Sequence, residues 1–182
     1  VDEVVEEATA AFEGFDYARA LERTEAVFWW FCDNYVELVK SRAYGDDDAE
    51  GTISARQALR SALSTLQRLL APIQPFATAE AWSWWNDTSV HRAEWPRPTG
   101  LGGDPTLVGP VIEVLANVRR AKTEAKRSQR SAVDEVVVTV PDEGTATAIR
   151  AGLADLTEAG SIGDLSVETG DSFAVHVDLA AE

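Results

Sequence analysis

Up to about residue 130, apolar residues repeat along the chain with the period of an α-helix. They recur every three to four positions, and Pro, Gly or runs of Asp separate one periodic segment from the next. Asp16 is a favourable N-cap for the second segment, and Ser54 with Gln57 fits a capping box at the third. The pattern predicts helices over residues 2–12, 17–43, 55–71, 76–85 and 107–130.

After residue 132 the pattern changes to that of β-strands. The β-branched run Val133–Val140 ends at a proline, and apolar residues at helical spacing over 146–156 follow it. Two further strands are expected at about 165–168 and 173–179. The Thr-Gly-Asp turn between them, at 169–171, predicts a hairpin. The C-terminal part therefore reads as a small α+β unit of βαββ order.

Together these elements predict a mainly α fold. A helical bundle comes first, and a long helix and the small βαββ unit follow it. Residues 86–105 are irregular and rich in Pro and Gly, which is typical of a domain boundary. We therefore expect a helical domain at 1–98, a linker with a long basic helix at 99–131, and the βαββ unit at 132–182.

The aromatic residues concentrate in the predicted helices. The run from Phe28 to Phe31 widens the apolar stripe of its helix, which predicts that other helices surround it. Most of the tryptophans lie within apolar stretches or close to helix ends and are expected in the core. The alternative is that some of them stack on nucleic-acid bases.

The chain offers few residues for catalysis or metal binding. Its single cysteine, Cys32, lies on an apolar stripe and is expected to be a buried structural thiol. We expect His91 to have a packing or capping role and His176 to be solvated on the last strand. Glycine-rich phosphate motifs and apolar runs long enough to span a membrane are absent from the sequence. We expect no catalytic site, metal site or cofactor in this chain.

Charge is unevenly distributed along the sequence. The chain has 31 Asp and Glu against 16 Lys and Arg, a formal net charge of −15, which argues against a protein that coats nucleic acid. Residues 51–131, however, carry 11 Lys and Arg against 6 Asp and Glu. The scarcity of Lys beside many acids favours a salt-adapted, halophilic protein. The alternative is an acidic protein from a GC-rich genome.

The basic residues of the predicted helix 107–130 form an ordered set. Four fall at i, i+3, i+7 and i+11 and share one face, and two more form a second row beside them. Such a stripe can follow the phosphates of a nucleic acid, and the alternative is a solvated face paired with nearby acids. The candidate contacts are Arg119, Arg120, Lys122, Lys126, Arg127 and Arg130, with Arg56 and Arg60 as second candidates.

Three strings, at residues 28–40, 70–82 and 89–96, resemble the anticodon-binding helical domain of valyl-tRNA synthetase. The first carries the Phe-Cys-Asp-x-Tyr-x-Glu-Leu-x-Lys pattern of that family. Isoleucyl and leucyl enzymes share the Pro-x-x-Pro-Phe and Glu-x-Trp parts of the others, and the Cys-Asp-x-Tyr part favours valyl. The resemblance covers 1–98 well, extends to the helix 107–130, and is loose over 132–182.

The resemblance implies a class I ligase that joins valine to its tRNA with ATP. The catalytic signatures of that family, His-x-Gly-His and Lys-Met-Ser-Lys-Ser, are absent, and the chain has no Met. We therefore expect a C-terminal piece of a cytoplasmic, monomeric, haloarchaeal parent, whose catalytic domain would hold ATP and Mg²⁺. Its partner would be tRNA, specifically tRNA(Val), with no membrane partner. The alternatives are the equivalent domain of an isoleucyl or leucyl enzyme, and a helical protein–protein interaction module with the acidic C-terminal unit as its docking surface.

Overall fold

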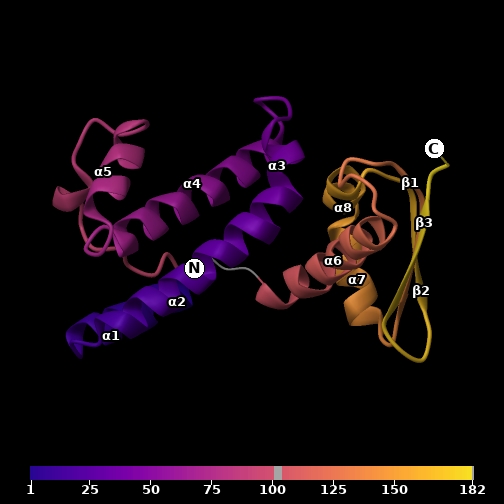
Figure 1. The fold of residues 1–182 in the computed structure, drawn as a ribbon, viewed down its shortest axis with the longest axis horizontal. Coiled ribbons are helices and arrows are strands. Elements are labelled where there is room, and N and C mark those ends of the chain that lie inside the picture. Colours follow the sequence, from indigo (N-terminus) through magenta and orange to yellow (C-terminus); the bar gives the residue numbers. More distant parts are fainter. Residues whose placement is uncertain (101–103, 182) are drawn as a thin grey trace. The chain divides into compact units, whose positions relative to one another are not determined.

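The computed structural model describes residues 1–100 and 104–181, which separate into two compact units. Of these residues, unit 1 contains 1–36 and 47–100, and unit 2 contains 37–46 and 104–181. Unit 1 is helical, and unit 2 combines helices with a three-stranded sheet (Figure 1). The predicted fold class, mainly α with a small α+β unit, is confirmed. The three-part division into domains stays a prediction.

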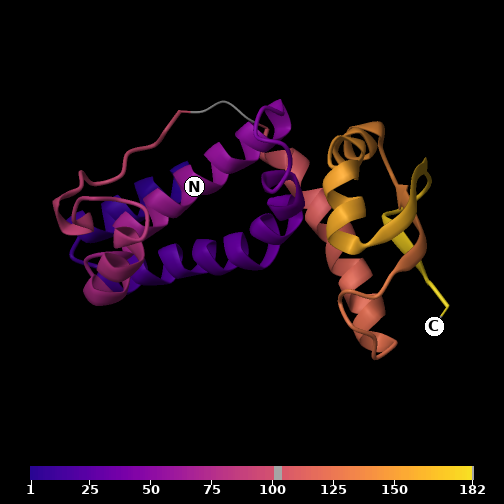
Figure 2. The ribbon, with the colours of Figure 1, turned by 90° about the horizontal axis from the view of Figure 1, so that it is seen from above.

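The core of unit 1 forms where helix faces that carry small and branched apolar residues pack together. Val4, Val5 and Ala8 pack against Leu69 and form one core cluster. The irregular chain after residue 86 runs back along the helices of unit 1 (Figure 2). The Asp2 carboxylate at the start of the first helix accepts hydrogen bonds from Thr99 and Gly100. The elements are α1 (Asp2–Glu13), α2 (Tyr17–Trp30), the π-helix η1 (Phe31–Val36), α4 (Glu50–Leu70), α5 (Pro75–Ser83) and the 3₁₀ turn η2 (Val90–Arg92).

Two helix starts can be compared with their predicted caps. The Asp16 carboxylate accepts a hydrogen bond from the backbone N–H of Arg19 at 3.1 Å, which confirms it as the N-cap of α2. The predicted capping box is wrong, because α4 already begins at Glu50 and Ser54 lies inside it. The helical run predicted over 17–43 exists, but a π-helical segment interrupts it at Phe31–Val36.

Unit 2 consists of a sheet with helices on one of its faces (Figure 1). The strand order is β2-β1-β3, with β1 parallel to β2 and antiparallel to β3. Four valines of β1, from Val133 to Val140, are buried against the helices. The elements are α3 (Glu37–Ala43), the 3₁₀ turn η3 (Pro105–Leu107), α6 (Val108–Glu124), β1 (Val133–Val140), α7 (Glu143–Ala151), α8 (Leu153–Gly160), β2 (Ile162–Thr169) and β3 (Ala174–Leu179).

Two details of the predicted βαββ unit are wrong. β2 and β3 do not form a hairpin, because each pairs with an opposite edge of the buried central strand β1. The single helix predicted over 146–156 is two helices separated at Gly152. A Cβ atom at Gly152 would lie only 2.8 Å from a methyl carbon of Val111 on α6, so this close approach of the backbone requires glycine.

The long helix predicted over 107–130 ends at Glu124, six residues early. Lys126 has the left-handed backbone conformation, with φ of 56°. The backbone N–H of Arg127 donates to the Lys122 carbonyl at 2.8 Å, and that of Lys126 donates to the Thr123 carbonyl at 2.9 Å. These two bonds define a Schellman motif, which closes the C-terminus of a helix.

Candidate functional site

The exposed tryptophans of unit 1 contradict the prediction that most tryptophans are buried. Of the six, only Trp82 is fully buried, whereas Trp29 is 54% exposed and Trp84 is 75% exposed. Trp30 is also exposed, so the aromatic run at Phe28–Phe31 is not surrounded by other helices. A large exposed aromatic side chain is informative because it presents a flat apolar surface to a ligand.

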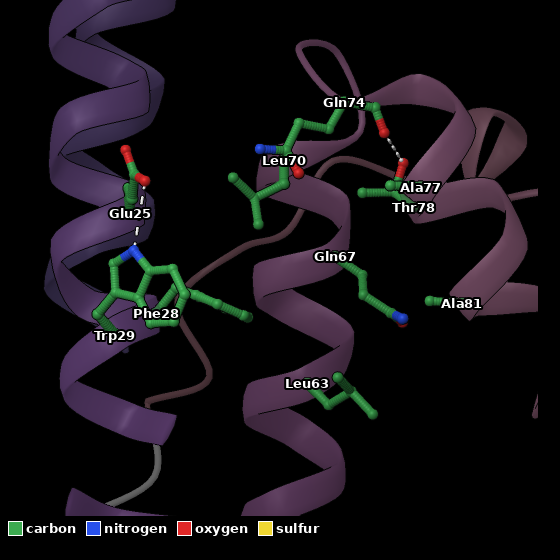
Figure 3. Close-up of a pocket in the computed structure, with 10 residues that line it drawn as sticks. All are labelled: Glu25, Phe28, Trp29, Leu63, Gln67, Leu70, Gln74, Ala77, Thr78 and Ala81. Carbon is green, nitrogen blue, oxygen red and sulfur yellow. Dashed lines mark hydrogen bonds between the residues drawn. The ribbon is translucent and has the colours of Figure 1, made fainter. Parts of the chain in front are cut away.

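Trp29 lies on the wall of a cavity of about 290 Å³ between α2, α4 and α5, which we call the aromatic cavity (Figure 3). The lining residues of each helix recur at spacings of three and four, so each helix contributes one face. The volume is close to the lower end of the range for small-molecule sites, about 300 Å³, and suits one planar ring system. The lining residues are Glu25, Phe28, Trp29, Leu63, Gln67, Leu70, Gln74, Ala77, Thr78 and Ala81.

Polar groups at the aromatic cavity are few, and most of them have a hydrogen-bond partner within the described residues. The indole N–H of Trp29 donates to the Glu25 carboxylate at 3.3 Å, which orients the ring. The Thr78 hydroxyl donates to the backbone carbonyl of Gln74 at 2.8 Å (Figure 3). The Gln67 side-chain oxygen accepts the indole N–H of Trp85 at 3.2 Å, and its amide nitrogen has no acceptor among the described residues. The Gln67 amide can therefore donate to a ligand in the cavity.

A second, more open hollow of about 400 Å³ lies beside the aromatic cavity and shares α4 with it. The Arg60 guanidinium carbon lies 5.4 Å from the ring centroid of Trp85, a cation–π contact. The hydrogen bond between Trp85 and Gln67 links the two depressions. Gln57, Ser61, Ser64 and Asn86 complete its lining. The site thus combines a flat aromatic surface, an amide donor and a nearby cation.

The other predicted contact on α4, Arg56, lies outside both depressions. Its guanidinium donates to the Asp47 carboxylate at 2.6 Å on an exposed surface. Its role as a phosphate contact stays a prediction.

The six basic residues predicted to form two neighbouring rows on one helix in unit 2 do not do so, because α6 ends before three of them. Lys122 is buried, and its ammonium donates to the carbonyl oxygens of Gly160 at 2.7 Å and Gln129 at 3.0 Å. The Arg127 guanidinium donates to the carbonyl of Ala180. Arg120, Lys126 and Arg130 are exposed, and Arg119 is half-buried. The prediction of a single continuous basic stripe is therefore wrong. Contacts of the individual residues with nucleic acid stay predictions.

The remaining candidates for chemistry have structural surroundings. Cys32 is half-buried rather than fully buried, and burial raises the pKa of its thiol. His91 is exposed, with its Nε2 atom 3.2 Å from the Pro75 carbonyl oxygen, so its packing or capping role stays a prediction, and His176 is exposed on β3 as predicted. Within residues 1–100 and 104–181, His, Cys, Asp and Glu form no cluster of three that could hold a metal ion. Among the described helices, none combines the length and the apolar character that crossing a membrane requires.

Sequence reasoning missed Trp29 and Gln67 as residues that line the aromatic cavity. Four consecutive aromatic residues point to all sides of a helix, so at least one of them had to leave the core, and this signal could have identified Trp29. The sequence carries no comparable signal for Gln67, because its position depends on which helices pack together.

Unit 1 is a helical module whose aromatic wall lies beside amide and arginine side chains, a composition typical of proteins that bind unpaired bases. Residues 1–138 match the family described as the anticodon-binding domain of tRNA ligase. The match covers most of the chain, and the chain belongs to this family.

Similar proteins support the valyl branch of the resemblance. The chain is 49% identical to a valine–tRNA ligase of Thermobifida fusca over 182 residues, which cover 97% of the chain and 20% of the relative. It is 46% identical to that of Leifsonia xyli, with 95% and 20% covered, and 40% identical to that of Cutibacterium acnes, with 97% and 21% covered. The chain thus spans about a fifth of the length of these relatives. These organisms are bacteria, so the expected haloarchaeal origin finds no support.

Proposed function

We propose that this chain is the tRNA-recognition part of a valine–tRNA ligase and that the aromatic cavity receives one unstacked base of the anticodon loop. The observation that carries the proposal is the half-exposed Trp29 ring beside the Gln67 amide in a cavity that suits a single ring system. Membership of the anticodon-binding family supports an RNA partner.

The chemistry of loop recognition fits the arrangement of these side chains. Bases in an RNA loop are unstacked, so their faces can stack on an aromatic ring while their edges accept or donate hydrogen bonds. Trp29 would supply the stacking surface and the Gln67 amide would donate to the base edge. Arg60, in the neighbouring hollow, would contact a phosphate of the adjoining nucleotide.

We assign the aminoacylation reaction itself to parts of the parent protein that lie outside this chain. We propose that the parent aminoacylates tRNA(Val) in the cytoplasm and that its catalytic domain binds ATP and Mg²⁺. The names of the relatives and their roughly fivefold greater length support this division of labour. We therefore expect the isolated chain to bind tRNA without attaching valine to it.

A matched pair of tryptophan variants tests the aromatic cavity. Trp29 and Trp84 are both exposed, and each donates its indole N–H to a glutamate one helical turn earlier, at 3.3 Å and 3.2 Å. Only Trp29 lines the cavity. Trp29→Ala is expected to weaken binding of an anticodon stem–loop RNA about 5- to 150-fold, the value of one base–aromatic stack, and Trp84→Ala to leave it nearly unchanged. Equal affinities for the two variants would contradict the proposal.

Specificity for tRNA(Val) needs a separate comparison. Anticodon stem–loops of valine, isoleucine and leucine tRNAs can be titrated against the same protein at one salt concentration, because RNA affinity depends strongly on salt. Tightest binding of the valine stem–loop is expected. Equal binding of all three would contradict readout of the valine anticodon while leaving general RNA binding in place.

A further inference from the structure

Trp85 lines the hollow beside the aromatic cavity, and two contacts hold its ring. The ring of the buried Trp82 lies 5.1 Å from the Trp85 ring, centroid to centroid. The Arg60 guanidinium carbon lies 5.4 Å from the Trp85 ring centroid. Packing against a buried indole and a cation–π contact together leave the ring little freedom to turn. The direction of the Trp85 indole N–H is therefore fixed before a ligand arrives.

This N–H decides which end of the Gln67 amide faces the aromatic cavity. The Trp85 indole nitrogen lies 3.2 Å from the Gln67 side-chain oxygen. An indole N–H can only donate a hydrogen bond, so its partner must be the amide oxygen and not the NH₂ group. Reversing the amide would place one donor against another. The Gln67 oxygen is therefore occupied, and the NH₂ group is the end that remains for a ligand.

The Gln67 NH₂ group is a donor without an acceptor among the described residues. Gln67 is only 7% exposed, and its side chain extends from α4 toward Ala81 on α5 (Figure 3). Within the described chain, Trp82 Nε1 is the one side-chain nitrogen or oxygen that is both fully buried and unpartnered, so the Gln67 nitrogen retains access to open space. Thr78, the other buried polar residue of the wall, already donates its hydroxyl to the Gln74 carbonyl. Gln67 thus supplies the buried donor of the cavity.

We infer that Trp85 is a positioning residue that sets which base the aromatic cavity accepts, an inference that rests on the proposed binding of an unstacked base. With the amide held in one orientation, the cavity takes a base that presents an acceptor to Gln67, either a carbonyl oxygen or an unprotonated ring nitrogen. A base that turns an amino group toward Gln67 leaves two donors facing each other. A buried donor left unpaired in this way costs about 5- to 150-fold in affinity. Trp85 thus controls base selection through Gln67, although it does not line the cavity.

Two matched variants test this role. Trp85→Phe keeps an aromatic ring and removes the N–H. Trp84→Phe makes the same change in the neighbouring tryptophan, whose N–H donates to Glu80 and which lines neither depression. The probes are anticodon stem–loop RNAs that differ at the loop position where an abasic substitution weakens binding by the wild type but not by Trp29→Ala. Uridine is compared there with cytidine, and inosine with adenosine, because each pair exchanges a carbonyl oxygen for an amino group on rings of the same size.

The affinity ratio within a pair is the readout. The wild type is expected to favour one member by about 5- to 150-fold, and Trp84→Phe should keep this ratio. Trp85→Phe should bring the ratio close to one, because either end of the Gln67 amide can then face the base. In a Gln67→Leu background, Trp85→Phe should change the ratio no further, since the side chain through which it acts is missing. Equal ratios for Trp85→Phe and Trp84→Phe, or no preference in the wild type, would overturn the inference.

A measurement without RNA tests the link between the two side chains. Hydrogen exchange of the indole N–H groups is followed by NMR in the wild type and in Gln67→Leu. The Trp85 signal should exchange faster in the variant, and the Trp84 signal should not change. Unchanged exchange at Trp85 would overturn the link independently of RNA binding. If no loop position depends on Trp29, the proposed function fails instead, and the exchange measurement still reports on the orientation of Gln67.

Discussion

The ammonium nitrogen of Lys122 lies 2.7 Å from the carbonyl oxygen of Gly160, the last residue of α8. Lys122 is only 1% exposed, although its position among basic residues suggests a surface role. Carbonyl groups in the last turn of a helix have no donor within the helix, and here a lysine from α6 supplies one. A residue predicted to contact RNA is therefore part of the framework of unit 2.

Replacement of Lys122 by methionine is expected to destabilise unit 2. Methionine keeps an unbranched apolar side chain but leaves the carbonyls of Gly160 and Gln129 without their donor. The expected loss is about 1–3 kcal/mol, the cost of a buried polar group left unpaired. Urea unfolding followed by circular dichroism measures it, and Arg120→Met on the exposed side of α6 should change stability by less than about 0.5 kcal/mol. Equal unfolding midpoints for the two variants would contradict the framework role.

The titration of Lys122 gives a pH dependence with a defined sign. Burial, and to a lesser degree the charge of Arg119, lowers the pKa of Lys122 below its ordinary value of 10.5. Between the pKa of the folded protein and 10.5 the unfolded chain binds more protons, so stability contributed by this group rises with pH in that window. Below the pKa of the folded protein, Lys122 is charged in both the folded and the unfolded state. The unfavourable contribution of its buried charge to stability is therefore independent of pH there. A side-chain NMR titration that placed the pKa of Lys122 at or above 10.5 would refute this.

Trp95 is expected to hold the irregular segment of unit 1 against α1. Its indole N–H donates to the Thr9 hydroxyl at 2.8 Å, and its ring meets Phe12 edge-on at 5.3 Å. Thr9→Val preserves the shape and removes the acceptor, so we expect a loss of about 1 kcal/mol in the free energy of unfolding. Thr88→Val, at an exposed position of the same unit, is the control. A loss no larger than that of the control would show that the hydrogen bond does not stabilise unit 1.

Repulsion among the acidic residues is expected to make stability depend on salt. Residues 1–50 alone carry 14 Asp and Glu against 4 Lys and Arg. Molar KCl shortens the screening length to about 3 Å and should weaken this repulsion. The melting temperature should therefore rise from low to molar KCl. An unchanged melting temperature would argue against salt adaptation.

Local sequence signals predicted the helices, the N-cap of α2 and the strands, because these features depend on residues that are close together in the sequence. The 3.6-residue period located the helices of unit 1 to within a few residues, and Asp16 marked the start of α2 because an N-cap acts on its own backbone neighbours. The valine run of β1 and the alternation in β3 identified the strands for the same reason. The family strings at 28–40, 70–82 and 89–96 identified the helical domain because they combine several such local requirements.

Features that depend on tertiary packing were not predictable in this way. A lysine at the C′ position of a Schellman motif is unusual, so no residue at this point indicates that α6 ends at Glu124. The turn at Thr169–Asp171 resembles a hairpin turn, but the buried strand β1 lies between β2 and β3 and pairs with both of them. The exposure of Trp29 depends on where α4 and α5 pack against α2, and apolar periodicity carries no such information.

The most direct test of the account is a double-mutant cycle between Trp29→Ala and single abasic substitutions in the loop of an anticodon stem–loop RNA. If one loop base stacks on Trp29, removing the base and removing the ring should not be additive at that position. We predict a coupling free energy of about 1–3 kcal/mol at one loop position for Trp29→Ala, and none at any position for Trp84→Ala. Additive effects of Trp29→Ala at every loop position, with the RNA still bound, would show that the aromatic cavity does not receive a base.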